Sequence, residues 1–195
     1  MLITFIMEMM ERNRKLRLLV TTDCPNHCPM CCNNQFDFDK LKRVEDFDYD
    51  EIMITGGEPL LFPRKVEELA RSIKTLNPIL YPGESVPKIY VYTSIASFIS
   101  LKRILNVVDG VVLTPHSKED VQRFISTNRS LGIHFKYYSN RHPSLRLNLF
   151  KNIKDMLPED IDLSLWKVKD IEWIKDCPVP KGEDFRRLPN LWSES

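Results

Sequence analysis

The chain contains 195 residues, which is enough for one domain with a sizeable hydrophobic core, or at most for two small domains. Hydrophobic residues make up 43% and charged residues 28%, a composition that excludes long disordered regions and is typical of globular proteins. With 28 Lys and Arg against 27 Asp and Glu, the formal net charge is +1. This balance argues against bulk electrostatic binding to nucleic acid or to an anionic membrane surface.

The N-terminal run Met1–Met10 is apolar but lacks the features of a secretion signal. No basic residues precede the apolar stretch, and no small-residue cleavage site follows it. No later stretch approaches the roughly 18 uninterrupted apolar residues of a membrane span. Four of the 5 cysteines crowd into residues 24–32, which indicates a metal site in a reducing compartment more than a disulfide framework. We therefore expect a cytoplasmic protein without a membrane anchor.

Short apolar and β-branched runs alternate with helical patterns along most of the chain. Strands are predicted at residues 17–22, 50–55, 88–93, 110–114, 133–138, 145–150 and 162–168. Helices are predicted at residues 64–77, where Pro78 should stop the helix, at about 98–105, and at 118–131, where Gly132 should close it. This alternation favours an α/β fold with a mostly parallel sheet, either open or curved into a partial barrel.

The tail after the last predicted strand has no periodic pattern. We expect a single domain over residues 1–195, with a core at about 16–168 and a C-terminal tail, 169–195, that covers it. Pro178, Pro180 and Pro189 favour an extended path that cannot join a central strand. The alternative is a disordered terminus.

A cysteine-rich loop follows the first predicted strand and therefore lies at the carboxyl end of the sheet, where α/β folds build their ligand sites. Its residues Cys24, Cys28 and Cys31 have the spacing Cys-x3-Cys-x2-Cys, which can direct three thiolates to three irons of a cubane cluster. Because such clusters normally have four thiolate ligands, this loop would leave one iron open to another ligand. The alternative is a zinc site in which Cys32 or His27 supplies the fourth ligand.

A second motif, Gly56-Gly57-Glu58-Pro59, ends the second predicted strand. Paired glycines leave room for a ligand against the backbone and expose amide and carbonyl groups at the strand end. Glu58 adds a carboxylate that can hold an ammonium group. The alternative is a plain strand-to-helix turn.

Together and in this order, the two motifs resemble those of the radical S-adenosylmethionine superfamily. The cysteine spacing is similar to the cluster motif of that family, and residues 56–59 are similar to its "GGEP" motif. The resemblance is firm over about residues 17–61. It implies a partial (β/α)6 TIM-type barrel and a [4Fe–4S] cluster on the three cysteines of the loop. It also implies S-adenosyl-L-methionine bound to the open iron, with its ammonium held by Gly56, Gly57 and Glu58.

The resemblance further implies an enzyme. A reduced cluster would cleave S-adenosylmethionine to a 5′-deoxyadenosyl radical, which removes hydrogen from a small-molecule or protein substrate. An electron donor such as flavodoxin or ferredoxin is the implied partner. The sequence departs from the family at Met30, because the residue before the third cysteine is often aromatic there and packs beside the adenine. A thioether can also pack on a ring face, so Met30 stays a candidate for this contact.

Other candidate residues follow later strands. In residues 145–150, alternation places Arg146 and Asn148 on one face and three leucines on the other. If the leucines pack against helices, Arg146 and Asn148 face the barrel interior, where the cofactor's carboxylate and ribose need partners. The alternative is a solvated edge strand. The resemblance also implies candidate ribose or substrate contacts at four positions that follow the third and fourth predicted strands: Thr93, Ser94, Thr114 and His116. The alternative for each of them is a purely structural role. We expect Cys32 and Cys177 to be small buried residues rather than hydrogen donors.

Two other functions stay open at this point. One is activation of a glycyl-radical enzyme, because Asn33 after the cysteine motif and the strand end Tyr92-Thr93 resemble the anaerobic ribonucleotide reductase activases. The additional predicted strands are more than such minimal activases need. The other is a non-catalytic zinc- or cluster-binding module that acts through its partners.

Overall fold

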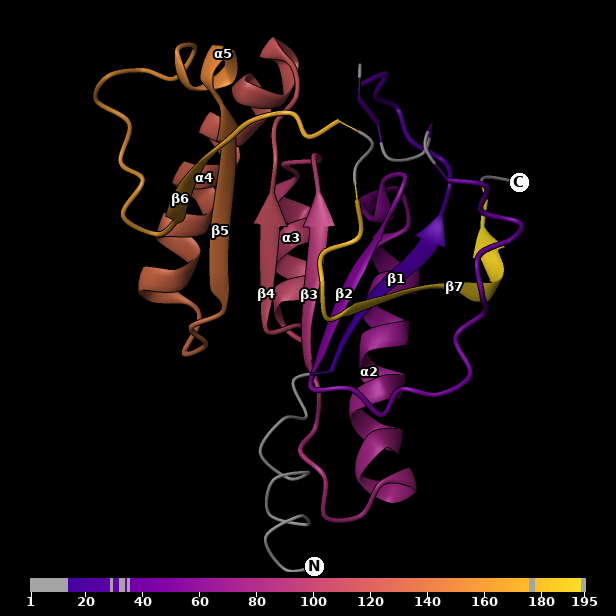
Figure 1. The fold of residues 1–195 in the computed structure, drawn as a ribbon. Helices are drawn as coiled ribbons and strands as arrows, with labels where there is room; N and C mark the ends of the chain where they lie inside the picture. The colour runs from indigo at the N-terminus through magenta and orange to yellow at the C-terminus, as the bar shows by residue number, and fades with distance from the viewer. Residues whose placement is uncertain (1–13, 29, 32–33, 35, 176–177, 194–195) are drawn as a thin grey trace, which may run out of the picture.

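The computed structural model describes residues 14–28, 30–31, 34, 36–175 and 178–193 (Figure 1). Within them, the strands are β1 (Lys15–Thr21), β2 (Glu51–Gly56), β3 (Lys88–Thr93), β4 (Gly110–Leu113), β5 (Ser144–Phe150), β6 (Lys167–Ile171) and β7 (Glu183–Trp192). The helices are η2 (Pro59–Leu61), α2 (Pro63–Leu80), α3 (Phe98–Leu105), α4 (Lys118–Tyr137) and α5 (Lys151–Lys154). All neighbouring strands pair in parallel in one sheet, so the fold is α/β, as predicted.

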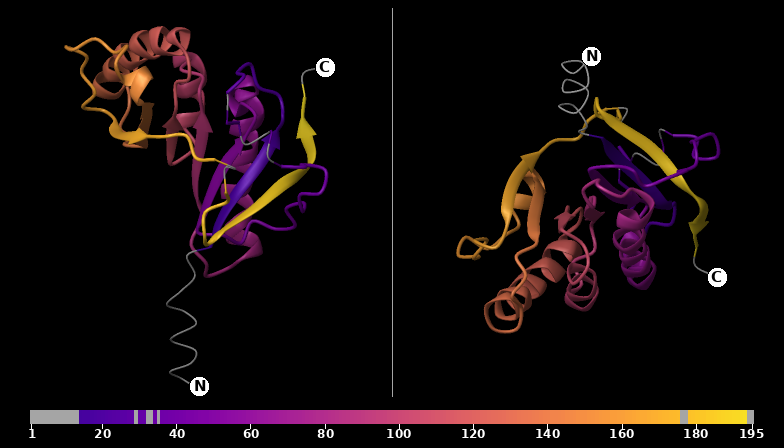
Figure 2. Two further views of the ribbon diagram at one scale, coloured as in Figure 1. Left: turned by 45° about the horizontal axis from the view of Figure 1, so that its top comes forward. Right: turned by 90° about the horizontal axis from the view of Figure 1, so that it is seen from below.

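The strand order, β6-β5-β4-β3-β2-β1-β7, explains where the helices lie. From β1 to β6 each strand is added on the same side of the one before it. Right-handed crossovers then place the connecting helices on one face of the sheet. Figure 2 shows α2, α3 and α4 together on that face. No helix of the described residues covers the opposite face, which we call the helix-free face. The sheet has two edges, β6 and β7, and does not close into a barrel.

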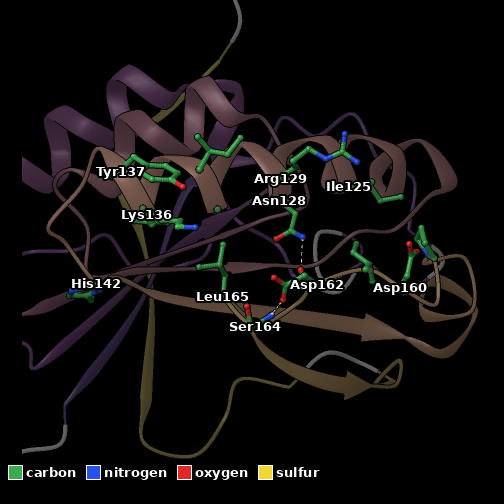
Figure 3. Close-up of a pocket in the computed structure, with 15 residues that line it drawn as sticks. Ile125, Asn128, Arg129, Lys136, Tyr137, His142, Asp160, Asp162, Ser164 and Leu165 are labelled. Carbon is green, nitrogen blue, oxygen red and sulfur yellow. Dashed lines mark hydrogen bonds between the residues drawn. The ribbon is translucent and has the colours of Figure 1, made fainter.

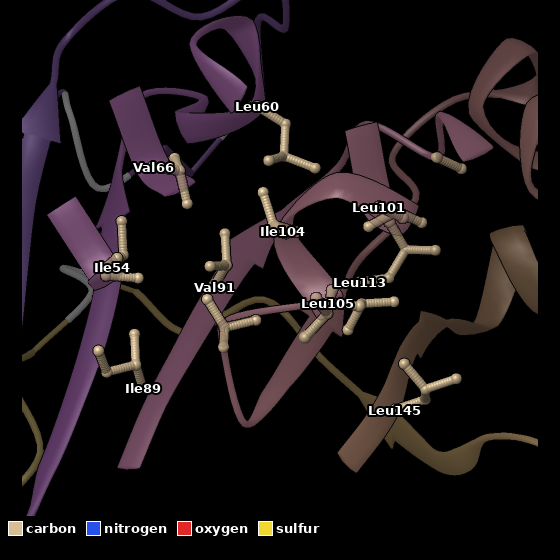
Figure 4. Packing of buried hydrophobic residues seen from close by; sticks show 14 of the residues in the cluster. Ile54, Leu60, Val66, Ile89, Val91, Leu101, Ile104, Leu105, Leu113 and Leu145 are labelled. Carbon is tan, nitrogen blue, oxygen red and sulfur yellow. The ribbon is translucent and has the colours of Figure 1, made fainter. Parts of the chain in front are cut away.

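The core fills the space between the helices and one face of the sheet. Figure 4 shows Ile54, Val91 and Leu113, from three neighbouring strands, near side chains of α3 such as Ile104. All four of these side chains are completely buried. Burying an aliphatic side chain of this size stabilises a fold by about 1.5–3 kcal/mol, so this layer fixes the sheet against the helices.

The opposite face of β5 carries the polar residues that alternation predicts. Leu145, Leu147 and Leu149 are buried in the core beneath the helices, whereas Arg146 and Asn148 are half-buried on the helix-free face. Of the two alternatives left open by the sequence, the structure therefore favours leucines in the core over a solvated edge strand, because β5 lies between β4 and β6. Arg146 and Asn148 share the face that carries Arg17 of β1, which is the face without a helix layer.

The expected helix end at Gly132, with a strand at 133–138, is wrong. Helix α4 begins at a capping box of Ser117 and Asp120 and continues through Gly132 to Tyr137. A glycine inside a helix costs only about 1 kcal/mol relative to alanine, and tertiary packing outweighs that cost. Phe135, in the last turns, packs against the core from the helix.

The expected strand at 162–168 is also misplaced, because β6 begins only at Lys167. Asn128 of α4 accepts a hydrogen bond from the Trp166 indole at 2.9 Å and donates one to the Asp162 carbonyl at 2.8 Å. These bonds hold the preceding segment against the helix instead of in the sheet. Trp166 is buried against Phe124, with ring centroids 5.4 Å apart.

The prediction that Pro78 stops the helix is wrong. Helix α2 runs to Leu80, two residues past the proline that was expected to stop it. Because Pro78 lies in the last turn, its missing N–H removes only one hydrogen bond near an end that frays in any case.

The tail contributes a strand that the sequence did not predict. Residues 183–192 form β7, which pairs in parallel with β1 at the edge of the sheet. An edge strand tolerates Pro189, whose missing N–H would break a central ladder. Strands β6 and β7 are opposite edges of the sheet, and the described residues between them are 172–175 and 178–182. Figures 1 and 2 show the described residues just before β7 passing over the helix-free face.

Candidate functional site

The two sequence motifs meet at the carboxyl edge of β1, β2 and β3. The backbone amide of Gly57 donates to the Thr21 carbonyl at 2.7 Å, and that of Glu58 donates to the Asp23 carbonyl at 2.7 Å. Thr21 ends β1 and Asp23 directly precedes Cys24. The GGEP segment is therefore hydrogen-bonded to the start of the cysteine loop.

The need for two glycines comes from this contact. A Cβ atom at Gly57 would lie 2.1 Å from the carbonyl oxygen of Asp23, and one at Gly56 would lie 2.3 Å from that of Thr21. Gly56 also has a φ of +138°, which other residues rarely adopt. The paired glycines were expected to leave room for a ligand. On the side where their Cβ atoms would lie, the backbone before Cys24 fills that space.

Glu58 is buried and fully hydrogen-bonded within the chain. Its Oε1 accepts from the amide of Leu60 at 2.9 Å and from the Thr93 hydroxyl at 2.5 Å. Its Oε2 accepts from the amide of Ser94 at 2.8 Å and from the Ser94 hydroxyl at 2.7 Å. A carboxylate offers about four acceptor positions, so these bonds use its capacity. Glu58 therefore ties the end of β2 to the end of β3, and an ammonium ligand would have to compete with one of these donors.

Asn26, which the sequence analysis did not single out, extends this network into the cysteine loop. Its side-chain amide donates to the Ser94 hydroxyl at 2.7 Å, and the same hydroxyl donates to Glu58. Asn26 lies between Cys24 and Cys28, so one side chain within the motif links the thiol-bearing loop to β3. A polar residue between two cysteines of the motif could have been noticed in the sequence. Its partner Ser94 could not, because it lies 68 residues further along the chain. We call Asn26, Glu58, Thr93 and Ser94 the clamp.

The three described thiols of the loop are half-buried and are not joined by a disulfide. Burial raises the pKa of the Cys24 thiol above its usual value, although the backbone of Asn26 opposes this change. Burial, followed by the charges of Cys31 and Cys24, raises the pKa of Cys28 to about 11. The neighbouring thiols therefore add to the effect of burial in disfavouring ionisation of Cys24 and Cys28, and a shared cation would reverse both effects.

The donor set of the loop fits an iron–sulfur cluster with three thiolate ligands. The Cys31 amide donates to the Cys28 carbonyl at 3.2 Å, so the last two thiols of the motif lie on one turn. Among the described residues, no three Cys, His, Asp or Glu side chains form a ready metal-binding group. A bound metal would therefore have to draw the thiols together, as is common when binding is coupled to ordering. Cys32 and Cys177 lie outside the described residues.

The remaining predicted residues lie away from the clamp or are more exposed. Met30 is 42% exposed, on the surface of the cysteine loop. The Arg146 guanidinium lies 4.9 Å from the centre of the Tyr90 ring on the helix-free face. No carboxylate pairs with Arg146 among the described residues. Asn148, on the same face, donates to the Thr114 hydroxyl at 3.5 Å, a long hydrogen bond.

His116 lies at the same edge, beneath an aromatic side chain from the segment after β6. Its ring stacks on Trp173 with centroids 5.6 Å apart, and Trp173 stacks on Phe150 at 4.2 Å. The Nδ1 atom of His116 is buried and has no hydrogen-bond partner among the residues that the structure describes. Burial lowers the pKa of His116 below its usual value, and the nearby Asp120 carboxylate partly opposes this change.

Another cavity lies away from the clamp. It has a volume of about 790 Å³ and lies between α4 and residues 158–165, as Figure 3 shows. The labelled side chains around it include Arg129, Lys136, His142 and Asp160. None of the residues predicted from the sequence to bind a metal or cofactor lines this cavity. Size alone does not identify the candidate site.

Comparison with known proteins adds no assignment at this point. No protein-family model matches the chain, and no curated protein matches it. Within the described residues, no helix is both long and apolar enough to cross a membrane. The geometry of the carboxyl edge and the sequence motifs are therefore the basis for the proposals below.

Proposed function

We propose that this protein is a radical S-adenosylmethionine enzyme, with a [4Fe–4S] cluster on Cys24, Cys28 and Cys31. The observation that carries the proposal is the junction of the two motifs at one sheet edge. The GGEP backbone is hydrogen-bonded to the residues before Cys24, and Glu58 is linked through Ser94 to Asn26, inside the cysteine motif. A zinc-binding loop would not need this second motif beside it.

A bound cluster supplies one electron for the reductive cleavage of S-adenosylmethionine. The residues of this chain hold, orient and shield the reactants. The clamp fixes the entry of the cysteine loop relative to β2 and β3, so that the thiols are presented at the carboxyl edge. Because the Glu58 carboxylate is saturated, we assign recognition of the cofactor's ammonium mainly to the backbone of Gly56 and Gly57.

Arg146 and Asn148 are proposed to contact the cofactor's carboxylate and ribose from β5. The Arg146 guanidinium packs over the Tyr90 ring, and no carboxylate of the described residues pairs with it. A cation that is positioned but unpaired can bind a carboxylate in the strong, charge-assisted way. Asn148 and Thr114 supply neutral donors and acceptors next to it, which suit ribose hydroxyls.

We further infer that the open sheet is a partial barrel, with the helix-free face as its interior. The monotonic order from β1 to β6, with the helices on one side, supports this interpretation. The segment before β7 then shelters the interior, which matters because radical chemistry requires the exclusion of water. The substrate and the electron donor, such as a flavodoxin or ferredoxin, are not specified by these contacts.

Anaerobic reconstitution with iron and sulfide tests the proposal. The wild-type protein should bind about four irons, turn brown, and form 5′-deoxyadenosine from S-adenosylmethionine after reduction with dithionite. Cys24→Ala, Cys28→Ala and Cys31→Ala should each lose this product, whereas Cys32→Ala should retain it. A colourless protein that binds one zinc and forms no 5′-deoxyadenosine would contradict the proposal.

A further inference from the structure

A second cavity lies on the helix-free face, between the sheet and the chain segment that crosses it. Its volume is about 260 Å³. Thr55 and Gly56 form part of its lining, so the cavity borders the GGEP motif directly. Phe36 and Phe38, from the chain just after the cysteine loop, line another side. The cavity therefore lies next to the candidate site and not at a remote surface.

Most of the side chains that line this cavity are apolar. Phe36 packs edge-on against Phe185 of β7, with ring centroids 5.1 Å apart, and lies 6.3 Å from the Phe38 ring. Ile174 and Val179, from the described residues between β6 and β7, also line it. Pockets for small organic molecules have this composition, in which hydrophobic and aromatic side chains surround a few polar groups.

The charge on the cavity wall is already neutralised. Arg17 is the one charged residue among the described residues that line the cavity. Its guanidinium binds Oε2 of Glu183 through Nε at 2.9 Å and through Nη2 at 2.8 Å. Both side chains are largely buried. An anionic ligand would have to break this pair or enter without a counter-charge, and either costs free energy.

The size of the cavity sets a limit on its occupant. An apolar cavity of about 150 Å³ can hold benzene. A cavity of about 260 Å³ therefore has room for one bicyclic ring or a branched aliphatic group of similar volume. Thr55, which carries a hydroxyl group, also lines the cavity and can help to orient such a ligand.

We propose that this cavity binds an uncharged apolar portion of the substrate, such as an aromatic ring or a compact hydrocarbon group. This inference rests on the proposed function for the identity of the ligand as substrate, but the existence of the site does not depend on the cluster. The helix-free face then has two binding regions. Arg146, which has no carboxylate partner among the described residues, binds an anionic group. Arg17, which is paired with Glu183, lines the cavity for an apolar group.

The test is indole binding to the full chain without its cluster, followed by NMR of the Ile174 and Val179 methyl groups. Indole should shift both signals in a saturable way. Indole-3-carboxylate, its anionic counterpart, should bind at least tenfold more weakly. Val179→Trp and Ile174→Trp, which fill the cavity from two positions, should each weaken indole binding at least tenfold. Val86→Trp, at an exposed position outside the cavity, should not change the affinity.

Three results would overturn the inference. They are methyl signals that do not respond to indole, tryptophan variants that still fold and bind indole as tightly as wild type, and tighter binding of the carboxylate than of indole. Because the measurement uses the apo chain, Cys28→Ala should bind indole normally even though it cannot assemble the proposed cluster. Failure of the cavity and failure of the enzyme assignment are therefore separate outcomes.

Discussion

The clamp at the ends of β2 and β3 and the polar face of β5 use charged residues in opposite ways. Glu58 is 1% exposed and accepts four hydrogen bonds from within the chain. Arg146 is half-buried and contacts an aromatic ring, without a carboxylate partner among the described residues. Because all four hydrogen-bond donors to Glu58 belong to this chain, we infer that Glu58 stabilises the structure of the site. A charge that is held in place but unpaired is the better candidate for binding a ligand.

The largest expected effect on stability is that of Glu58→Ala. The substitution leaves two backbone amides and two hydroxyls without their acceptor in a buried place, so we expect a loss of about 3–5 kcal/mol in the free energy of unfolding. Urea denaturation measures it. Glu67→Ala is the matched control, because Glu67 makes only surface ion pairs with Arg71 and Arg103 and should cost less than about 1 kcal/mol. Equal losses in the two variants would remove the distinction.

The next effect is that of Gly57→Ala, which tests the close approach of the GGEP segment to the cysteine loop. The added methyl group would meet backbone atoms of Asp23 that cannot rotate away, so we expect a loss of about 1–3 kcal/mol or more. Gly132→Ala, within α4, should instead stabilise the protein by about 0.5–1 kcal/mol, because the nearest atom to its Cβ is 3.7 Å away. Thermal unfolding compares both with wild type. A harmless Gly57→Ala would mean that the loop can move aside.

Asn26→Ala should cost about 1 kcal/mol, the typical worth of one hydrogen bond, because it removes only the link from the clamp to the cysteine loop. Its main effect should be on the loop itself. We expect Cys24 and Cys28 to react faster with iodoacetamide in the apo protein, as measured residue by residue with mass spectrometry. Asn34→Ala, at an exposed position after the motif, is the control. Unchanged alkylation rates would show that the clamp does not order the thiols.

His116 should make stability depend on pH. Its folded-state pKa lies below the ordinary value of 6.5, so below about pH 6.5 the unfolded chain binds more protons than the folded one. Stability should therefore be complete above that pH and should decrease as the pH falls towards the folded-state pKa. His116→Phe should flatten this part of the profile measured by urea denaturation at pH 5 to 8. A variant with the wild-type slope would assign the dependence to other groups.

The smallest effect on stability should come from Arg146→Ala, at most about 0.5 kcal/mol, because the side chain makes no buried ion pair. Its effect on the affinity of the reconstituted protein for S-adenosylmethionine should be ten- to a hundredfold, equivalent to about 1.5–3 kcal/mol for a charge-assisted bond. Lys167→Ala removes the exposed cation that lies opposite Arg146 in the register of β5 and β6 and should leave the affinity unchanged. Equal effects would indicate a general electrostatic contribution.

The strands that form the centre of the sheet were predictable from local pattern. Residues 88–93 form β3 as predicted, and the neighbouring strands differ from their predicted bounds by one or two residues. The face of β5 that carries Arg146 followed from alternation, because successive side chains of a strand point to opposite sides. Each of these features depends on a few consecutive residues. Local pattern failed at residues 133–138. Their β-branched and aromatic residues favour a strand, but residues 133–137 form the last turns of α4.

The amino-acid sequence by itself determined the α/β class, the order of the two motifs, and their position at the carboxyl ends of neighbouring strands. Only the tertiary structure decided that β7 pairs with β1, that Glu58 is saturated by Thr93 and Ser94, and that Asn26 joins the clamp. The physical reason is the distance along the chain between the residues that interact. Periodicity and turn chemistry act over a few residues, whereas the partner of a buried carboxylate or of an edge strand is chosen among groups tens to more than a hundred residues away.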